Sequence, residues 1–194
     1  MDRLDRKDLW SLEEYSGRRD TFRAEVMEHK KSRQVALGDH ARLFFEDQLT
    51  IRYQVQEMLR IEKIFEAAGV QEELDAYNPL IPDGSNFKAT FMLEYGDESE
   101  RQRRLQQLVG VERDIYIKVD GFEPLHPIAD EDLQRQNDGK TSSVHFLRFE
   151  VPQDVRDAIK SGSSISIGVE HPQLTVTATQ IESNVRDSLV DDLN

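Results

Sequence analysis

The chain has 194 residues, enough for one domain or for two small lobes that share a hydrophobic core. It contains no cysteine, which excludes disulfides, thiolate ligands for zinc or iron–sulfur clusters, covalent haem attachment and cysteine nucleophiles. Its formal net charge of −13 argues against nonspecific binding of nucleic acid, because phosphate contacts depend on accumulated Lys and Arg.

The first ten residues are rich in charge and lack the apolar centre of a secretion signal. No apolar run elsewhere approaches the length of a membrane span. We therefore expect a cytoplasmic protein that does not enter the membrane. We interpret residues 1–194 as a single domain, with a helical part over about 1–82 and an α+β part over about 86–194.

A long helix is expected from residue 12 to about residue 33. Ser11 and Glu14 have the spacing of a capping box, and Gly17 is the weak point of the run. On a helical wheel the apolar side chains Tyr15, Phe22 and Val26 share a face with the cations Arg19, Lys30 and Arg33. These cations either pair with an acidic group on a packed helix or extend outward to water.

Residues 34–46 have the pattern of a β-hairpin with its turn at Gly38, Asp39 and His40. Strand alternation then puts five apolar side chains on one face, namely Val35, Leu37, Ala41, Leu43 and Phe45. His40 is thereby expected at an exposed tip.

The second long helix is expected to begin after Asp47, its N-cap, and to end at Gly69. Its wheel shows two apolar faces, one of Ile51, Val55, Met58 and Phe65 and one of Leu49, Tyr53, Ile64 and Ala67. The side assigned to water holds Gln48, Arg52, Gln56, Lys63 and Glu66. A polar stripe of Thr50, Gln54 and Glu57, continued by Ile61, lies between the two apolar faces.

This stripe points the carboxylate of Glu57 inward, where an unpartnered ionised carboxylate costs several kcal/mol. Glu57 then needs a cation, a metal ion or a proton retained through a raised pKa. We hypothesise that Arg19 reaches Glu57 across the packed helices. Two interpretations stay open, a structural salt-bridge network and a ligand or metal site. The residues proposed for either role are Arg19, Arg33, Thr50, Gln54, Glu57, Arg60 and Tyr77. No catalytic residue or metal ligand is assigned.

Residues 44–82 carry FE, T, Q, EM, R and E in order, followed by ELDAYNPLIP. In this arrangement they resemble the bacterial domain-of-unknown-function family 3501. The segments HKKSRQVALG and TSSVHFLRFE resemble it too, so the likeness covers nearly the whole chain. Members of that family have no established activity. Their genes are often found beside those of a rubrerythrin-like protein and an iron–sulfur oxidoreductase, and the resemblance implies these two as possible partners.

A short helix over 71–77 is expected to stop at Asn78 and Pro79. Its polar residues Glu72, Glu73, Asp75 and Tyr77 either line a cleft or face water. Strands are then expected over 86–95, 115–119, 143–151, 165–170 and 174–180, with helices over about 97–108, 152–162 and 181–194. Residues 121–140 form a long loop, and loops of that length are usually functional or disordered.

The predicted fold class is α+β. We expect two long N-terminal helices with a small hairpin, followed by a mainly antiparallel sheet of about five strands with three helices.

Several chemistries lack their motifs. A diiron bundle needs helical ExxH motifs, and the prolines beside Glu123 and His126 prevent a helix there. The five histidines show no HxH or HExxH spacing, although a metal site built from distant strands, such as His145 with His171, stays open. No GxGxxG, P-loop or GxSxG motif occurs.

Our leading interpretation is a noncatalytic accessory or binding protein of the cytoplasm. It would act with an iron–sulfur oxidoreductase and a rubrerythrin-like protein in redox or oxidative-stress metabolism, as the resemblance implies. The alternative is a small-molecule or metal-dependent enzyme whose pocket is centred on Glu57. A third possibility is a homodimer joined through the strand edges of the second half. The sequence identifies no cofactor.

Overall fold

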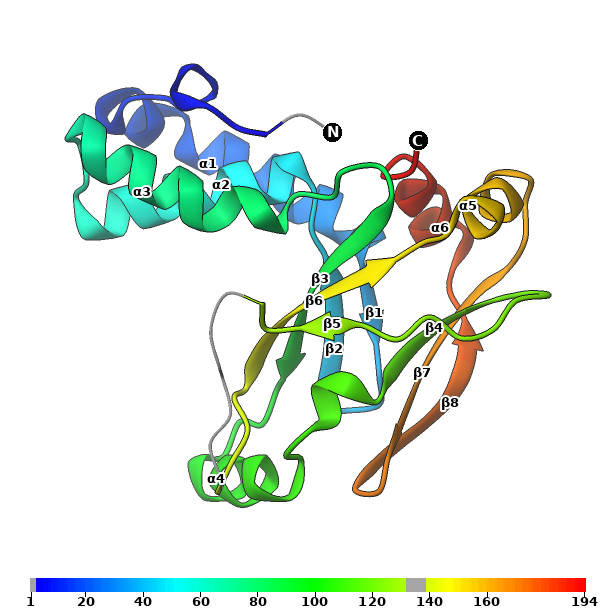
Figure 1. Cartoon of the computed structure of the whole chain (residues 1–194). Helices are drawn as coiled ribbons and strands as arrows, with labels where there is room; N and C mark the ends of the chain where they lie inside the picture. The colour runs from blue at the N-terminus through cyan, green and yellow to red at the C-terminus, as the bar shows by residue number, and fades with distance from the viewer. Residues whose placement is uncertain (1–2, 132–138) are drawn as a thin grey trace.

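The computed structural model describes residues 3–131 and 139–194, and Figure 1 shows the arrangement of its helices and strands. The first part holds η1 (Arg6–Asp8), α1 (Leu12–His29), η2 (Lys30–Arg33), β1 (Gln34–Ala36), β2 (Ala41–Phe45), α2 (Gln48–Glu62), α3 (Ala67–Tyr77) and η3 (Asn78–Leu80). The second part holds β3 (Asn86–Leu93), α4 (Glu98–Gln107), η4 (Val111–Arg113), β4 (Ile115–Val119), β5 (Ile128–Ala129), β6 (Val144–Glu150), α5 (Gln153–Lys160), β7 (Ile165–His171), β8 (Leu174–Gln180) and α6 (Ser183–Val190). The α+β class is confirmed.

The strands form two sheets instead of the one sheet expected in the second half. The larger has the order β1-β2-β3-β6-β5 and the smaller the order β4-β7-β8, and neighbouring strands in both are antiparallel. The N-terminal hairpin, correctly predicted, belongs to the larger sheet because β2 pairs with β3, from Ala41 opposite Leu93 to Phe45 opposite Ala89. A two-stranded hairpin is marginal in water, and this pairing supplies the packing that it lacks.

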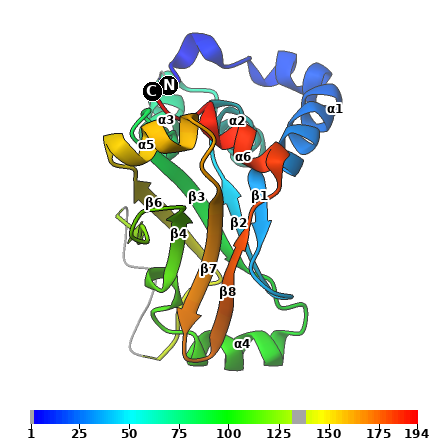
Figure 2. The same ribbon diagram turned by 90° about the vertical axis from the view of Figure 1, so that its right-hand side faces the viewer.

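The two sheets bury one shared hydrophobic core. Leu43, Phe91 and Phe149 of the larger sheet belong to the same buried cluster as Ile117 and Ile167 of the smaller sheet. Figure 2 shows β7 and β8 in front of the larger sheet, with α5 and α6 at one end of both. The opposite face of the larger sheet carries half-buried side chains, and Phe44, Thr90 and Phe146 lie in one row across β2, β3 and β6.

The helical part is built from helix pairs. Tyr15, Phe22 and Val26 of α1 pack with Tyr53 of α2, while a second cluster joins α2 to α3 through residues such as Val55, Leu59 and Leu74. The predicted start of α1 is confirmed, since the Ser11 side chain accepts a hydrogen bond from the Glu14 amide at 3.2 Å. A 3-10 turn, η2, extends the segment to Arg33.

The second long helix is shorter than predicted. It ends at Glu62, and Lys63 adopts a left-handed conformation with φ 57° while its amide bonds to the carbonyl of Leu59. Phe65, assigned to an apolar face, is consequently 72% exposed, and Ile61 is 60% exposed. Gly69 lies inside α3, where a Cβ would come within 2.8 Å of the Ile64 side chain. Gly69 therefore permits close packing instead of ending a helix.

The side of α2 assigned to water is covered in part by the N-terminal segment. Gln56 is fully buried, and it accepts a hydrogen bond from the Trp10 amide at 2.7 Å and donates to the Trp10 carbonyl at 3.4 Å. The guanidinium of Arg52 lies 4.2 Å from the centroid of the Trp10 ring. A helical wheel contains no information on this contact, because the covering segment lies about forty residues away in sequence.

Three further expectations concern His40, the long loop and membrane spans. His40 is exposed, as predicted, and stacks on Tyr95. The long loop over 121–140 contains β5, and its residues 132–138 lie outside the described part of the chain. Across residues 3–131 and 139–194, no helix combines the length and the apolar character that a membrane span requires.

Candidate functional site

The predicted pairing of Arg19 with Glu57 is present. Arg19 donates two hydrogen bonds to the Glu57 carboxylate, at 2.8 and 2.9 Å, across the α1–α2 contact. Tyr15 donates its hydroxyl to the same carboxylate at 2.7 Å, and Arg60 approaches from α2 itself at 3.2 Å. We call this group of Tyr15, Arg19, Glu57 and Arg60 the helix clasp.

Electrostatics in the helix clasp favour an ionised carboxylate. The hydrogen bonds from Arg19 lower the pKa of Glu57 to about 2, against the opposing effect of burial, and Tyr15 and Arg60 add to the lowering. Burial and the Glu57 charge raise the pKa of Tyr15. Glu57 thus obtains a cation from within the chain, so it requires neither a metal ion nor a retained proton.

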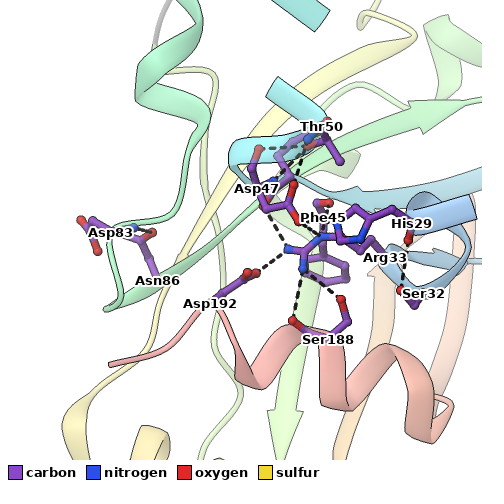
Figure 3. A network of polar contacts seen from close by, with 11 residues as sticks. His29, Ser32, Arg33, Phe45, Asp47, Thr50, Asp83, Asn86, Ser188 and Asp192 are labelled. Atoms are coloured by element: carbon purple, nitrogen blue, oxygen red, sulfur yellow. Dashed lines mark hydrogen bonds and ion pairs between the residues drawn. The ribbon is translucent and has the colours of Figure 1, made fainter. Parts of the chain in front are cut away.

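Arg33 does not approach Glu57 but forms a second cluster, drawn in Figure 3. Its side chain is 2% exposed and reaches Asp47 at 3.2 Å and Asp192 at 2.5 Å. Nε and Nη2, which make these two contacts, also donate to the carbonyls of Phe45 and Glu46, and Nη1 donates to both oxygens of Ser188. We call Arg33, Asp47 and Asp192 the Arg33 network. It ties the C-terminal tail to the start of α2.

Asp192 is the residue of the Arg33 network that the sequence analysis missed. Burial raises the pKa of Asp192 to about 6, although Arg33 opposes that shift. Its second oxygen, Oδ1, has no hydrogen-bond partner among the described residues. An acidic residue three positions from the end of the chain resembles the rest of an acidic tail, so no local pattern distinguishes it.

Thr50 lies in the first turn of α2 and forms hydrogen bonds with the N-cap residue, Asp47. Its amide donates to Asp47 Oδ1 at 2.9 Å, and its hydroxyl accepts from the Asp47 amide at 3.0 Å, which completes a reciprocal cap. The same hydroxyl donates to Glu46 Oε2 at 2.5 Å. The three polar residues of the predicted stripe therefore do not form one site. Thr50 belongs to the N-terminal cap of α2, Glu57 belongs to the helix clasp, and Gln54 lines the smaller cavity.

Two cavities lie between the helical part and the outer face of the larger sheet. The larger measures about 750 Å³ and the smaller about 320 Å³. They share Tyr77, Leu80 and Phe146 as wall residues, and we call the two together the cleft. Of the proposed site residues, Tyr77 lines both cavities and Gln54 lines the smaller, whereas Glu57 lines neither of them. Neither cavity is therefore centred on Glu57, contrary to the alternative interpretation of the sequence.

The polar walls of the larger cavity come from both parts of the chain. The cationic side chains are Arg3, Lys88 and Arg148, and the acidic ones are Glu73, Asp83 and Glu131. Glu73 is the member of the predicted acidic group on α3 that joins Tyr77 here, and burial with the neighbouring carboxylates of Glu62 and Glu72 raises its pKa. Arg148 is paired with Glu131 at 2.6 Å and also contacts Glu150.

Lys88 differs from Arg148, the other cation that the larger sheet contributes to the cleft. Its ammonium forms no ion pair with any residue in the described ranges, and its cross-strand neighbour on β6 is the cation Arg148. Desolvation lowers the pKa of Lys88, and the Arg148 charge lowers it further. Alternation along β3 puts Lys88 on the face opposite the buried Phe87 and Ala89.

The histidines do not assemble a metal site. His145 contacts Asp130 at 2.6 Å and the Thr141 hydroxyl at 2.9 Å, whereas His171 contacts the Val109 carbonyl and the Gln173 amide. Each ring is occupied by its own neighbours, one on β6 and one on β7. In the part of the chain that the structure describes, no three His, Cys, Asp or Glu residues group closely enough to hold a metal ion.

Comparisons with known proteins give a family and a fold. A family model described as "Protein of unknown function (DUF3501)" matches residues 3–193. A crystal structure of a novel protein of unknown function from Burkholderia pseudomallei K96243 is 49% identical, covers 100% of both chains and superposes with a TM-score of 0.96. No curated protein matches the chain.

Proposed function

This chain belongs to the DUF3501 family of proteins of unknown function, and from that premise we propose that it is a binding protein whose cleft takes a small organic anion with an apolar body. The size of the larger cavity, about 750 Å³, falls in the range of small-molecule sites. Its apolar walls include Met58, Tyr77, Leu80 and Phe146.

The unpaired ammonium of Lys88 carries the proposal. A desolvated cation beside a second cation, Arg148, is unfavourable unless an anion joins them. Two carboxylates near Lys88, Glu131 in the same cavity and Glu150 on β6, are bound to Arg148, and neither forms an ion pair with Lys88. A ligand carboxylate placed at Lys88 would form charge-assisted hydrogen bonds with its ammonium.

Titration calorimetry with hexanoate tests this proposal. We expect Lys88→Met to weaken hexanoate binding about tenfold or more, which corresponds to losing one charge-assisted contact. The matched control is Lys118→Met, because Lys118 also lies on a strand but is exposed and lines neither cavity. Equal binding of hexanoate to wild type and Lys88→Met, or no binding at all, would contradict the proposal.

The charge state of Lys88 gives an independent measurement. An anion bound beside the ammonium stabilises its charged form, so hexanoate is expected to raise the lowered pKa of Lys88 toward its ordinary value. NMR of the protein with its lysines reductively ¹³C-methylated follows this pKa directly, with Lys118 as the internal reference. An unchanged Lys88 pKa at saturating hexanoate would place the anion elsewhere.

We also propose that the protein is cytoplasmic and acts as a noncatalytic accessory to an iron–sulfur oxidoreductase and a rubrerythrin-like protein in redox or oxidative-stress metabolism. The resemblance noted from the sequence supports this, and a chain without cysteine leaves thiolate-bound clusters to a partner. Two exposed apolar side chains, Ile61 and Phe65, at the turn between α2 and α3 provide a contact for a partner protein.

A pull-down from the native host tests the accessory role. Wild type is expected to recover an iron–sulfur protein that Phe65→Ser recovers less well, and Thr21→Ala on the exposed side of α1 is the control. Recovery of no such protein would argue against the role. Homodimerisation through a strand edge, for example that of β8 in the smaller sheet, is a separate proposal that light scattering at several protein concentrations tests.

A further inference from the structure

The smaller cavity contains a buried carboxylate that no part of the proposed function has used. Glu46 follows β2 directly and is 8% exposed. Its two oxygens accept hydrogen bonds from threonine hydroxyls, Oε1 from Thr90 at 2.6 Å and Oε2 from Thr50 at 2.5 Å. The side chain lines the smaller cavity together with Gln54 and Lys30.

The charge of Glu46 is not neutralised by an ion pair with any residue in the ranges described. The nearest bound guanidinium, that of Arg33, donates to the main-chain carbonyl of Glu46 at 3.1 Å and directs its charge to Asp47 and Asp192. A carboxylate offers about four lone-pair positions, and the two hydroxyls occupy two of them. Glu46 can therefore accept two further hydrogen bonds from a donor in the cavity.

The walls around Glu46 suit a cation on an apolar stem. Phe44, Tyr77 and Phe146 supply aromatic rings, and Ile51, Leu80 and Met92 supply aliphatic surface. Aromatic faces attract ammonium groups, and a desolvated carboxylate binds them more strongly than an exposed one. Both features favour an amine over an anion or a neutral sugar beside Glu46, and the cation Lys30 lies elsewhere in the lining of the cavity without an ion pair to Glu46 among the described residues.

Glu46 and Lys88 are neighbours on the sheet that open into different cavities. The Glu46 amide donates to the Lys88 carbonyl at 2.8 Å, which puts the two residues opposite each other across β2 and β3. Yet Glu46 lines the smaller cavity and Lys88 the larger. The two cavities are adjacent, since they share Tyr77, Leu80 and Phe146 as wall residues.

We propose that the smaller cavity is an ammonium subsite and that the ligand of the cleft is an amino carboxylate whose two charged ends are separated by an aliphatic chain. The ammonium binds Glu46 and the carboxylate binds Lys88. This inference rests on the proposed function for the carboxylate end, whereas the ammonium end stands on Glu46 alone.

Three probes of matched length separate the two ends, namely 6-aminohexanoate, hexanoate and hexylamine. Titration calorimetry on wild type is expected to show about tenfold or tighter binding of 6-aminohexanoate than of hexanoate. Glu46→Gln is expected to remove that advantage and leave hexanoate binding unchanged. Glu170→Gln, at an exposed strand position that lines neither cavity, changes the net charge equally and serves as the control.

The outcomes distinguish this inference from the proposed function. If hexanoate binds through Lys88 but 6-aminohexanoate binds no tighter, the ammonium subsite is overturned and the anion site stands. If hexylamine binds through Glu46 and hexanoate does not bind, the anion site is overturned and the subsite stands. If no probe binds, both are overturned. Thermal unfolding shows whether Glu46→Gln is folded. If it is not, the comparison of the three probes on wild type still tests the ammonium subsite.

Discussion

Buried charges in this chain are of two kinds, and they differ in what neutralises them. In the helix clasp and the Arg33 network, the half-buried carboxylate of Glu57 and the buried carboxylates of Asp47 and Asp192 each contact a guanidinium of the same chain. In the cleft, Lys88 and Glu46 each lack an ion pair with the described residues and open into a cavity. A charge that the chain pairs internally is costly to strip of its partner, whereas a buried or half-buried charge without an ion pair beside a cavity indicates a ligand. Replacing one member of an internal pair is therefore expected to lower the free energy of unfolding, whereas replacing the unpaired Lys88 is not.

The largest effect is expected at Arg33. Arg33→Met removes the guanidinium from the buried carboxylates of Asp47, which keeps its contact with His29, and Asp192, and breaking a buried pair costs about 3–5 kcal/mol. Urea unfolding measures this loss. Arg23→Met, on the exposed side of α1, is the control and is expected to change stability by less than about 0.5 kcal/mol. Similar losses in the free energy of unfolding for the two variants would show that the ion pairs of Arg33 do not stabilise the fold.

A smaller effect is expected at Glu57, with a defined dependence on pH. Because Arg19 lowers the pKa of Glu57 to about 2 from 4.5, its contribution is fully present above about pH 4.5 and is lost as pH falls toward 2. Above pH 4.5, Glu57→Gln is expected to cost about 2 kcal/mol, allowing for partial solvent screening. Glu13→Gln, an exposed residue of α1, is the control. A difference from wild type that does not shrink in acid would contradict the pairing.

Asp192 is expected to show the opposite dependence on pH. Its pKa is raised from 3.8 to about 6, so its protonated form stabilises the fold and that contribution is lost as pH rises through about 6. Relative to Asp192→Asn, wild type is expected to lose about 1–2 kcal/mol between pH 4 and pH 7, with Asp20→Asn as the control. If wild type gains stability relative to Asp192→Asn over that range, the Arg33 pair outweighs burial and Asp192 belongs with Glu57.

The smallest effect on stability is expected in the cleft. Lys88→Met removes an ammonium that the fold leaves unpaired, so the free energy of unfolding is expected to stay within about 0.5 kcal/mol of wild type or to rise. The same variant loses hexanoate binding, and this combination separates a ligand site from a structural contact. A loss of stability comparable with that of Arg33→Met would show that Lys88 has a structural partner. Lys88 would then belong with the charges that the chain pairs internally.

The relation of α1 to α2 was predictable because it depends on local periodicity. Ser11 and Asp47 are caps that act within one turn, and the helical positions of Arg19 and Glu57 put both charges at the edges of contacting apolar stripes. The break at Lys63 was not predictable in this way, since a lysine in the left-handed conformation leaves no signature comparable with that of glycine.

The amino-acid sequence by itself determined the α+β class, the hairpin, the strand alternation and the clasp between the first two helices. Each of these follows from the repeat of a helix or a strand, which acts over a few residues. Only the tertiary structure decided that the strands divide into two sheets, that Asp192 reaches Arg33 from 159 positions away, and that Lys88 and Glu46 border a cleft. The physical reason is that burial of a polar side chain depends on which distant segment covers it, and the period of its own strand does not contain that information.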